Sequence, residues 1–259
     1  MEKKAKIYKV IDLARIYGIH PNTIRLYEKL GFISKAKRNM NNYRIFEELH
    51  ALQIKVCRYI LGYPFTNKHI RNASNEIMWS IAKKQWDEAG QNTDCYIQMI
   101  EQEIKKAQKA CEMLDNWANS IKNNEILLEN KMLSRKDIAD YLGVTTEAIR
   151  NWERNGLILA EQVGKKGKKL YSSTDLGRMH IIYMLLQSGY SMASIHHSIS
   201  MYDKGHAELV SSALDCQEYD DFISVGDRWL YELNKLLEAA QKIPSIIEEM
   251  KNLSDDYLL

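Results

Sequence analysis

The sequence has few prolines, few cysteines and no long apolar segment. Its 259 residues include only three prolines and four cysteines. The low proline content excludes collagen-like and proline-rich low-complexity chains. No apolar run approaches the roughly 18 residues of a membrane span, and the basic N-terminus lacks the apolar stretch of a signal peptide. We therefore expect a globular cytoplasmic protein that does not contact a membrane.

The cysteines do not form a recognisable site. Cys57, Cys95, Cys111 and Cys216 lie far apart, and no pair has the spacing of a metal-binding or redox motif. Cys95 lies near the start of a long predicted helix, as a sensor thiol would, but no neighbouring Cys or His completes a ligand set. The sequence also lacks a glycine-rich phosphate loop and a nucleophile elbow. We expect no metal, no cofactor and no enzymatic activity.

Charge is distributed unevenly along the chain, although the net charge is only +2. Residues 1–75 contain 15 basic and 5 acidic residues, and residues 133–205 contain 10 and 7. The remaining residues contain 11 basic and 22 acidic ones. Two basic blocks between acidic ones fit two polyanion-binding heads on a solvated frame, although charged helix surfaces also serve solubility alone.

An internal repeat sets the expected domain organisation. Over about twenty positions without a gap, identical or similar residues recur at an offset of 125. The first copy contributes Leu13-Ala14, Gly18-Ile19, Ile24-Arg25, Tyr27-Glu28 and Gly31-Phe32-Ile33, and the second contributes Ile138-Ala139, Gly143-Val144, Ile149-Arg150, Trp152-Glu153 and Gly156-Leu157-Ile158.

Each copy predicts the same series of helices. A short helix ends at Gly18 or Gly143, because glycine tolerates the left-handed turn. A second helix begins at Pro21 in copy one and behind the cap Thr145 in copy two. Ser134 and the acidic first turn that follows it predict a cap for the short helix of copy two. The first and third helices are expected at 10–17 and 48–61 in copy one and at 135–142 and 174–188 in copy two, with a further helix behind Thr66 or Ser191.

A short basic stretch between the second and third helices completes a winged helix-turn-helix in each copy. The second helix presents a polar face to the DNA major groove, and the wing places cations beside the phosphates. The predicted fold is mainly α, with two winged helix-turn-helix domains, short β wings and a long coiled-coil-like helix after each. The expected boundaries are 1–75 and 131–203 for the winged domains and 76–130 and 204–259 for the helical segments.

The second helix and the wing resemble the mercury-resistance-regulator (MerR) family of transcription factors. The family signature contains Thr-Leu-Arg-Tyr-Tyr-Glu, then Gly-Leu and a wing with Gly-Tyr-Arg. Copy one is specific, with the segments Thr23-Ile24-Arg25-Leu26-Tyr27-Glu28 and Asn42-Tyr43-Arg44. Copy two matches in its helices, with Ala148-Ile149-Arg150-Asn151-Trp152-Glu153, and is looser in its wing.

The resemblance implies a DNA interface in each copy. Arg25 and Tyr27 would contact the DNA backbone or groove edge, Arg44 would clamp a phosphate, and Arg150 and Trp152 occupy the matching places in copy two. The expected DNA-binding residues are His20, Asn22, Thr23, Arg25, Tyr27, Lys37, Arg38, Tyr43 and Arg44 in copy one, and Thr145, Thr146, Arg150, Trp152, Lys165, Lys166, Lys168 and Lys169 in copy two.

Base reading would fall to the start of each second helix. Asn22 can read adenine, whereas Glu147 can accept a hydrogen bond from cytosine or serve only as a helix cap. Because these residues differ, we expect the two heads to prefer different half-sites.

The wing of copy two departs from the family pattern. Residues 164–171 read Gly-Lys-Lys-Gly-Lys-Lys-Leu-Tyr, so lysines replace the planar arginine fork. The repeat resumes at Gly62 and Gly189 with an offset of 127. We therefore expect two fewer residues between wing and third helix in copy one, and a less selective grip on DNA in copy two.

The long helices carry coiled-coil seams. Apolar residues recur in steps of three and four over 97–121 and 226–250, and Pro244 is expected to kink or restart the second helix. Members of the family dimerise through such a helix. We expect either an intramolecular pseudo-dimer, in which the two helices pair within one chain, or a homodimer with four heads.

Aromatic residues cluster around the long helices. Relatives in this family often recognise hydrophobic effectors, and such a cluster can line a pocket, although aromatic residues at helical spacing usually form packed core. The candidate effector-pocket residues are Trp79, Trp86, Tyr96, Trp117, Phe222 and Trp229.

Two functional hypotheses remain open. The first is a nucleoid-associated transcriptional regulator of bacterial type that binds a promoter through two unequal heads and distorts it, with RNA polymerase as a partner implied by the family. The alternative is an architectural DNA-binding factor for recombination, excision or plasmid maintenance.

Overall fold

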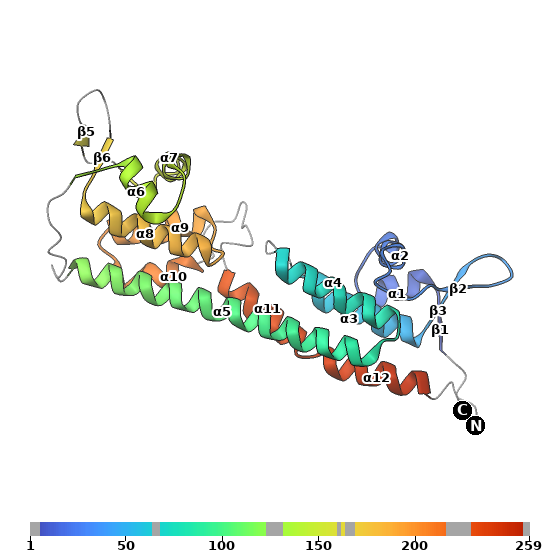
Figure 1. The fold of residues 1–259 in the computed structure, drawn as a ribbon. Coiled ribbons are helices and arrows are strands. Elements are labelled where there is room, and N and C mark those ends of the chain that lie inside the picture. Colours follow the sequence, from blue (N-terminus) through green and yellow to red (C-terminus); the bar gives the residue numbers. More distant parts are fainter. Residues whose placement is uncertain are drawn as a thin grey trace. The chain divides into compact units, whose positions relative to one another are not determined.

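The computed structural model describes residues 6–63, 68–122, 132–159, 162–163, 169–215 and 229–255. Short strands and helices follow one another in the same order in both halves of the chain as far as the fourth helix of each (Figure 1). The first half contains β1 (Ile7–Tyr8), α1 (Val10–Ile16), α2 (Pro21–Leu30), β2 (Lys37–Arg38), β3 (Arg44–Glu47), α3 (Glu48–Leu61), α4 (Lys68–Ala82) and α5 (Trp86–Lys122). The second contains β4 (Leu133–Ser134), α6 (Arg135–Leu142), α7 (Thr146–Arg154), β5 (Gln162–Val163), β6 (Lys169–Tyr171), α8 (Ser173–Gln187), α9 (Met192–Asp203), the 3-10 helix η2 (Ala207–Leu209), α10 (Val210–Leu214), α11 (Trp229–Ala240) and α12 (Ile243–Asp255).

Head 1, from β1 to α4, and head 2, from β4 to α9, are both winged helix-turn-helix modules. Each contains a three-stranded antiparallel sheet, with strand orders β1-β3-β2 and β4-β6-β5. The repeat extends into the cores, because buried residues of the two heads correspond at the offset of 125. The corresponding buried residues include Leu13, Ile24, Phe46 and Ile54 in head 1 and Ile138, Ile149, Tyr171 and Met179 in head 2.

The helix caps agree with the sequence prediction. Pro21 is the first residue of α2, and Gly31 ends that helix in the left-handed conformation, with φ of 73°. Ser134 caps α6 by accepting a hydrogen bond from the backbone N–H of Asp137, and Thr145 caps α7 in the same way. These caps satisfy backbone donors that the first turn of a helix leaves without partners. The local sequence therefore fixes where α2, α6 and α7 begin.

The position of the two additional residues in copy two corrects the sequence prediction. Glu47 and Ser172 cap the third helices of the two heads and still correspond at the offset of 125, so the wings are equally long. The difference lies at the far end of these helices. Gly62 itself caps α3, whereas α8 is one residue longer and ends at the cap Ser188, which Gly189 follows. Ser191 then caps α9 as predicted, while Thr66 lies outside the described residues.

The chain forms two compact units that cut across the expected domain boundaries. Unit 1 covers residues 1–102 and 233–259, and unit 2 covers residues 103–232. Unit 1 thus combines head 1 with the helix α12 of copy two. Unit 2 combines head 2 with the second part of α5, which belongs to copy one. Each head is covered by helical residues from the other copy.

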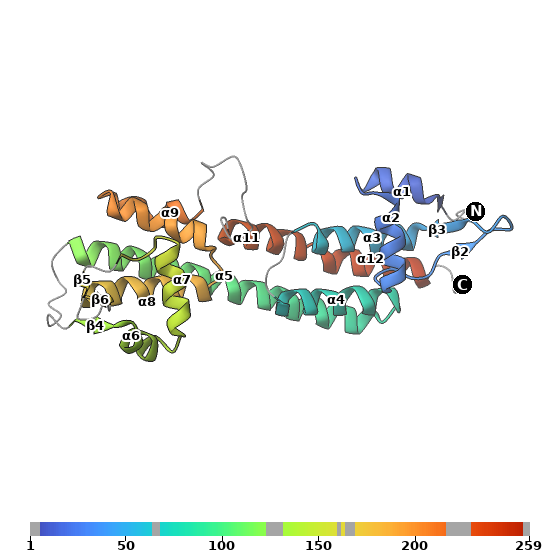
Figure 2. The same cartoon turned by 90° about the horizontal axis from the view of Figure 1, so that it is seen from above.

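The contacts within the units show this exchange. In unit 1, α12 packs along α3 (Figure 2), and the Nζ atom of Lys242 lies 5.8 Å from the ring centroid of Tyr59. In unit 2, the rings of Trp117 on α5 and Tyr202 on α9 have centroids 4.5 Å apart. Ser211 also donates a hydrogen bond of 3.3 Å to the backbone carbonyl of a residue of α5.

The predicted seams coincide with buried faces of the long helices. The second seam is divided between α11 and α12, and Pro244 is the second residue of α12, which agrees with the expected restart. The buried seam residues are Ile100, Ile104, Ala107, Leu114 and Ala118 on α5, and Trp229, Leu233, Leu236, Ala240, Ile243, Ile247 and Met250 on α11 and α12. Gly226 lies outside the described residues. Among the described helices, none is long and apolar enough to span a bilayer.

Candidate DNA interface

The recognition helix α2 presents its polar residues at its first turns. His20 caps the helix, and its Nδ1 atom accepts a hydrogen bond of 3.2 Å from the backbone N–H of Asn22. The Asn22 side chain in turn accepts a hydrogen bond of 2.5 Å from Nη1 of Arg25. All three side chains are exposed, whereas Ile24 between them is fully buried and holds the helix on the head. The amphipathic sequence therefore orients these predicted residues toward solvent.

A basic pocket lies between α2 and the wing of head 1. Its volume is about 520 Å³. Arginines and lysines predominate in its wall, which favours a polyanion because most of the affinity for DNA comes from phosphate contacts. The lining residues are Arg25, Glu28, Lys29, Lys35, Ala36, Arg38 and Arg44. Lys29 and Lys35 were not predicted from the sequence, because neither belongs to the family motif.

The single carboxylate in this wall connects the recognition helix to the wing. Glu28 accepts a hydrogen bond of 2.6 Å from Nε of Arg44 on β3 and one of 3.1 Å from the backbone N–H of Ala36. Because Glu28 lies on α2, these bonds fix the wing against the helix. The pair is largely shielded, with side-chain exposures of 32% for Arg44 and 13% for Glu28.

The wing tip of head 1 is held by asparagines. Nη1 of Arg38 donates to the backbone carbonyl of Asn42 at 2.9 Å, and Asn42 adopts a left-handed conformation, with φ of 62°, which asparagine tolerates. Next to it, the side chain of Tyr43 is 71% exposed. Lys37 on β2 pairs with Glu47 at 3.1 Å. The predicted wing residues of head 1 therefore all lie on an accessible hairpin.

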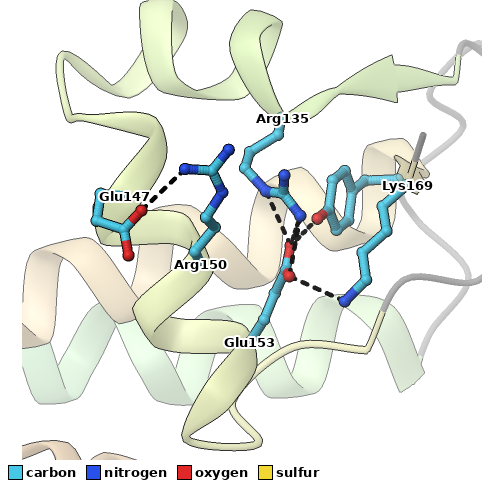
Figure 3. A network of polar contacts seen from close by, with 6 residues as sticks. Arg135, Glu147, Arg150, Glu153 and Lys169 are labelled. Atoms are coloured by element: carbon cyan, nitrogen blue, oxygen red, sulfur yellow. Dashed lines mark hydrogen bonds and ion pairs between the residues drawn. The ribbon is translucent and has the colours of Figure 1, made fainter. Parts of the chain in front are cut away.

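Glu153 in head 2 occupies the position of Glu28 but has different partners (Figure 3). Arg135, the first residue of α6, donates from Nη2 to both carboxylate oxygens, at 2.9 and 3.0 Å. Lys169 of β6 adds an ion pair of 2.9 Å, and the hydroxyl of Tyr171 donates to the same carboxylate. The carboxylate thus joins α6, α7 and the wing. Sequence reasoning missed Arg135, since its partner lies 18 residues further on.

The protonation of this cluster follows from its contacts. Burial raises the pKa of a carboxyl, but hydrogen bonds from Tyr171, Lys169 and Arg135 outweigh burial at Glu153, so the pKa of Glu153 lies below its usual value. Burial, followed by the hydrogen bond to Glu153, raises the pKa of Tyr171 to about 12. At neutral pH the cluster therefore contains an ionised carboxylate and a protonated phenol.

The recognition helix α7 carries an acidic residue among its cations. Glu147 accepts from Nη1 of Arg150 at 2.9 Å and from Nη2 of Arg154 at 3.0 Å, and Figure 3 shows the first of these pairs beside the Glu153 cluster. The hydrogen bond from Arg150 lowers the pKa of the exposed Glu147 carboxyl. Thr145 and Thr146 are the cap and the first residue of this helix. The predicted base-reading residues of head 2 therefore lie in the same places as those of head 1.

The structure corrects two predicted DNA contacts. Tyr27 is only 5% exposed and Trp152 only 3% exposed, so their rings cannot lie against DNA. Tyr27 packs beside Phe32, with ring centroids 6.4 Å apart. Both residues follow the recognition arginine by two positions, which places them on the opposite, core-facing side of the helix. Their role is to anchor the recognition helix.

Three further predicted lysines, Lys165, Lys166 and Lys168, lie outside the described residues. Lys169 is described and points to Glu153. It corresponds to Arg44 at the offset of 125. In each head a wing cation thus pairs with the carboxylate of the recognition helix, and this cation is an arginine in head 1 and a lysine in head 2.

The candidate effector-pocket residues are distributed over both units. Trp79, Trp86 and Tyr96 belong to unit 1, and Trp117 and Trp229 belong to unit 2, while Phe222 lies outside the described residues. Trp79 and Trp229 both contact other parts of the fold. The indole N–H of Trp79 donates to the backbone carbonyl of Leu30 at 3.0 Å, and Trp229 packs against Gly189.

The described cysteines show no metal site. Cys57 is fully buried, which raises the pKa of its thiol. Cys111 lies 3.0 Å from the hydroxyl of Tyr190, and Cys95 is exposed. Over the part of the chain that the structure describes, no three His, Cys, Asp or Glu side chains are arranged to hold a metal ion. Cys216 lies outside that part.

Comparisons with known families match both heads. Residues 9–46 match the model described as "MerR family regulatory protein", and residues 133–201 match "MerR HTH family regulatory protein". No solved structure matches the chain.

Two curated proteins are similar to about half of the chain. The mercuric resistance operon regulatory protein of Bacillus cereus is 25% identical over 115 residues, which are 44% of this chain and 80% of that protein. A probable heavy metal-dependent transcriptional regulator of Haemophilus influenzae is 26% identical over 116 residues, which are 45% of this chain and 89% of that protein. Most of each relative therefore corresponds to less than half of the present chain.

Proposed function

Because the chain is a MerR-family DNA-binding regulator with two MerR-type domains, we propose that it binds a promoter through both heads and distorts the DNA between them. The observation that carries this proposal is the basic pocket between the recognition helix and the wing of head 1. Its cations face the groove between two elements that a winged helix-turn-helix places on DNA. Head 2 repeats the same elements with another set of polar residues, so the two half-sites differ in sequence.

The two heads of one chain replace the two subunits of a dimer in this proposal. Two features support it: each compact unit combines a head with a helix of the other copy, and each relative matches less than half of the chain. Bending or untwisting DNA costs of order 1–6 kcal/mol, which phosphate contacts from two heads can offset. RNA polymerase is the partner that uses the distorted promoter.

Footprinting on the upstream region of the protein's own gene tests the proposal. We expect wild-type protein to protect two adjacent half-sites, and Arg25→Ala and Arg150→Ala each to weaken protection in a different one. Lys109→Ala removes a cation from an exposed position on α5 and serves as the matched control. Loss of protection with Arg25→Ala alone would show that head 2 does not bind DNA.

Light scattering at micromolar concentration tests the pseudo-dimer. We expect a mass close to the 30.2 kDa of one chain. A mass near twice this value would establish a homodimer with four heads instead.

A hydrophobic effector is the finer part of the proposal and rests on the resemblance to the family, because Trp79, Trp117 and Trp229 have packing contacts within their own units. Binding should quench tryptophan fluorescence across a panel of hydrophobic cations and neutral drugs. A flat response over the whole panel would remove the effector from the proposal.

An architectural role in recombination is the second candidate, favoured by the presence of two heads on one chain. It predicts DNA bending with no change in transcription of the flanking gene. A bending assay combined with in vitro transcription distinguishes the two roles.

A further inference from the structure

The two recognition helices differ at one exposed position of their first turn. His20 and Thr145 cap α2 and α7 at the offset of 125. The second helical residue is therefore Asn22 in head 1 and Glu147 in head 2, and the arginines Arg25 and Arg150 follow three positions later. Both acceptors and both arginines are exposed.

In each head, this second residue holds the recognition arginine. Asn22 accepts from Arg25 at 2.5 Å, and Glu147 accepts from Arg150 at 2.9 Å. The geometry is the same side-chain pair three residues apart on a helix. The chemistry differs, because the amide leaves the arginine's positive charge unbalanced, whereas the carboxylate neutralises it.

Glu147 acts on a second cation as well. Its other oxygen accepts from Arg154 at 3.0 Å, one helical turn beyond Arg150. One carboxylate thus serves both exposed arginines of α7. The face that head 2 turns toward phosphates therefore carries a lower positive potential than the corresponding face of head 1, where Asn22 is neutral.

We propose that this position determines the base preference of each head: Asn22 selects adenine and Glu147 selects cytosine. An asparagine amide both donates and accepts, and it pairs with N6 and N7 of adenine in the major groove. A carboxylate only accepts, and its partner there is the N4 amine of cytosine. Guanine and thymine offer acceptors at the same groove edge, which repel a carboxylate, and adenine has its N7 acceptor beside its amine, so cytosine is the base that fits a carboxylate best. The inference rests on the proposed binding of both heads to DNA.

The position is well suited to exchange between the heads. Exposed ion pairs contribute little to stability, and both asparagine and glutamate are tolerated in the first turn of a helix. Neither side chain is part of a core. Variants at this position should therefore fold as the wild type does, which far-UV circular dichroism can verify.

The test is selection of bound sequences from a randomised DNA library by full-length protein. The variants are Glu147→Asn, Asn22→Glu and the double exchange. We expect Glu147→Asn to change one position of one half-site from cytosine to adenine. Asn22→Glu should cause the reverse change in the other half-site, and the double exchange should interchange the two preferences. The ratio of affinities for the two bases should change about tenfold or more.

A charge control separates base reading from general attraction. Glu112→Asn removes one negative charge from an exposed position on α5 and should leave every selected base unchanged. Glu147→Asn should also raise affinity for random DNA and steepen its dependence on salt by about one counterion.

The outcomes are distinct. If Glu147→Asn and Asn22→Glu alter affinity while both half-sites keep their bases, the proposal is overturned and the position sets only charge. If wild-type protein selects no sequence at all, the proposed function itself fails, and this result is visible before any variant is compared.

Discussion

The two heads use the same carboxylate position in different ways. In head 1, Glu28 ties the recognition helix to the wing through Arg44 and a backbone N–H. In head 2, Glu153 does so through Lys169 and Tyr171, and it also recruits Arg135 from the preceding helix. The duplication thus keeps the acceptor and changes the donors. Both copies keep the partly shielded carboxylate, whereas the cations around it come from different elements in the two heads.

The largest expected difference between the heads lies at the turn after the third helix. Gly189 has φ of 98°, and a Cβ atom there would collide with the Trp229 indole. At Gly62 a Cβ atom would meet the backbone carbonyl of Arg58, but φ is −72°, so of these two turns only the one at Gly189 carries left-handed strain. Gly189→Ala should therefore destabilise unit 2 by about 3 kcal/mol, from backbone strain and overpacking together. Hydrogen exchange of unit 2 amides measures the effect.

The control for this variant is Gly143→Ala. Gly143 is also left-handed, but no atom outside its own neighbourhood lies within 4 Å of the added methyl. The cost should be about 1 kcal/mol. Equal effects of the two variants would mean that the indole does not constrain the turn.

Removal of the carboxylate that joins the recognition helix to the wing, Glu28 in head 1 or Glu153 in head 2, should lower the stability of head 2 more than that of head 1. Glu153→Ala deprives three side chains of their acceptor and should cost roughly 2 kcal/mol of local stability, whereas Glu28→Ala should cost about 1 kcal/mol. Hydrogen exchange of α6 and α7 against α1 and α2 checks the comparison. A larger loss in head 1 would contradict the importance of Arg135.

The Glu153 cluster should make the stability of head 2 depend on pH at both extremes. The pKa of Glu153 is lowered on folding, so its contribution is complete above the unfolded value of about 4.3 and is lost as pH falls through the folded pKa. The pKa of Tyr171 is raised to about 12, so its contribution is complete below about pH 10 and is lost as pH approaches 12. The free energy of unfolding of wild type and Glu153→Gln, measured across pH, shows both effects. The variant should lack the loss of stability at acid pH that Glu153 causes.

The smallest expected effect comes from exchanging the wing cations. Arg44→Lys removes the planar fork and should weaken binding at the half-site of head 1 by a few-fold, while Lys169→Arg should strengthen the other half-site by a similar factor. Fluorescence anisotropy on separate half-sites measures both. If the two exchanges leave DNA affinity unchanged, these side chains serve only to pair with Glu28 and Glu153.

Local features of the fold could be predicted from the sequence. The helices could be located to within a residue or two from the repeat, from Pro21 and from the caps Ser134 and Thr145, because caps depend on neighbouring backbone groups. The exposed polar face of α2 and α7 followed from the same pattern. The predicted difference of two residues between the wing and the third helix was wrong, since the offset at Gly62 and Gly189 did not reveal where the additional residues were inserted.

Features that depend on tertiary contact could not be predicted in this way. Trp152 was expected at the DNA because it occupies the place of Tyr27 in the family motif, yet its side chain belongs to the core. The motif included Glu153, but nothing in the spacing indicated that Arg135 and Lys169 would converge on it. The heptad pattern of α12 showed an apolar face, and only the structure showed that α3 covers it.

The exchange of helices determines the order in which the chain can fold during synthesis. Unit 2 is one continuous stretch, so all of its parts have left the ribosome once residue 232 has emerged. Unit 1 is interrupted by that stretch, and the apolar face of α3 waits for α12, which is translated about 190 residues later. Closing so long a loop is slow but costs little additional entropy, because the cost grows only with the logarithm of loop length. The head that is synthesised first is therefore the one completed last.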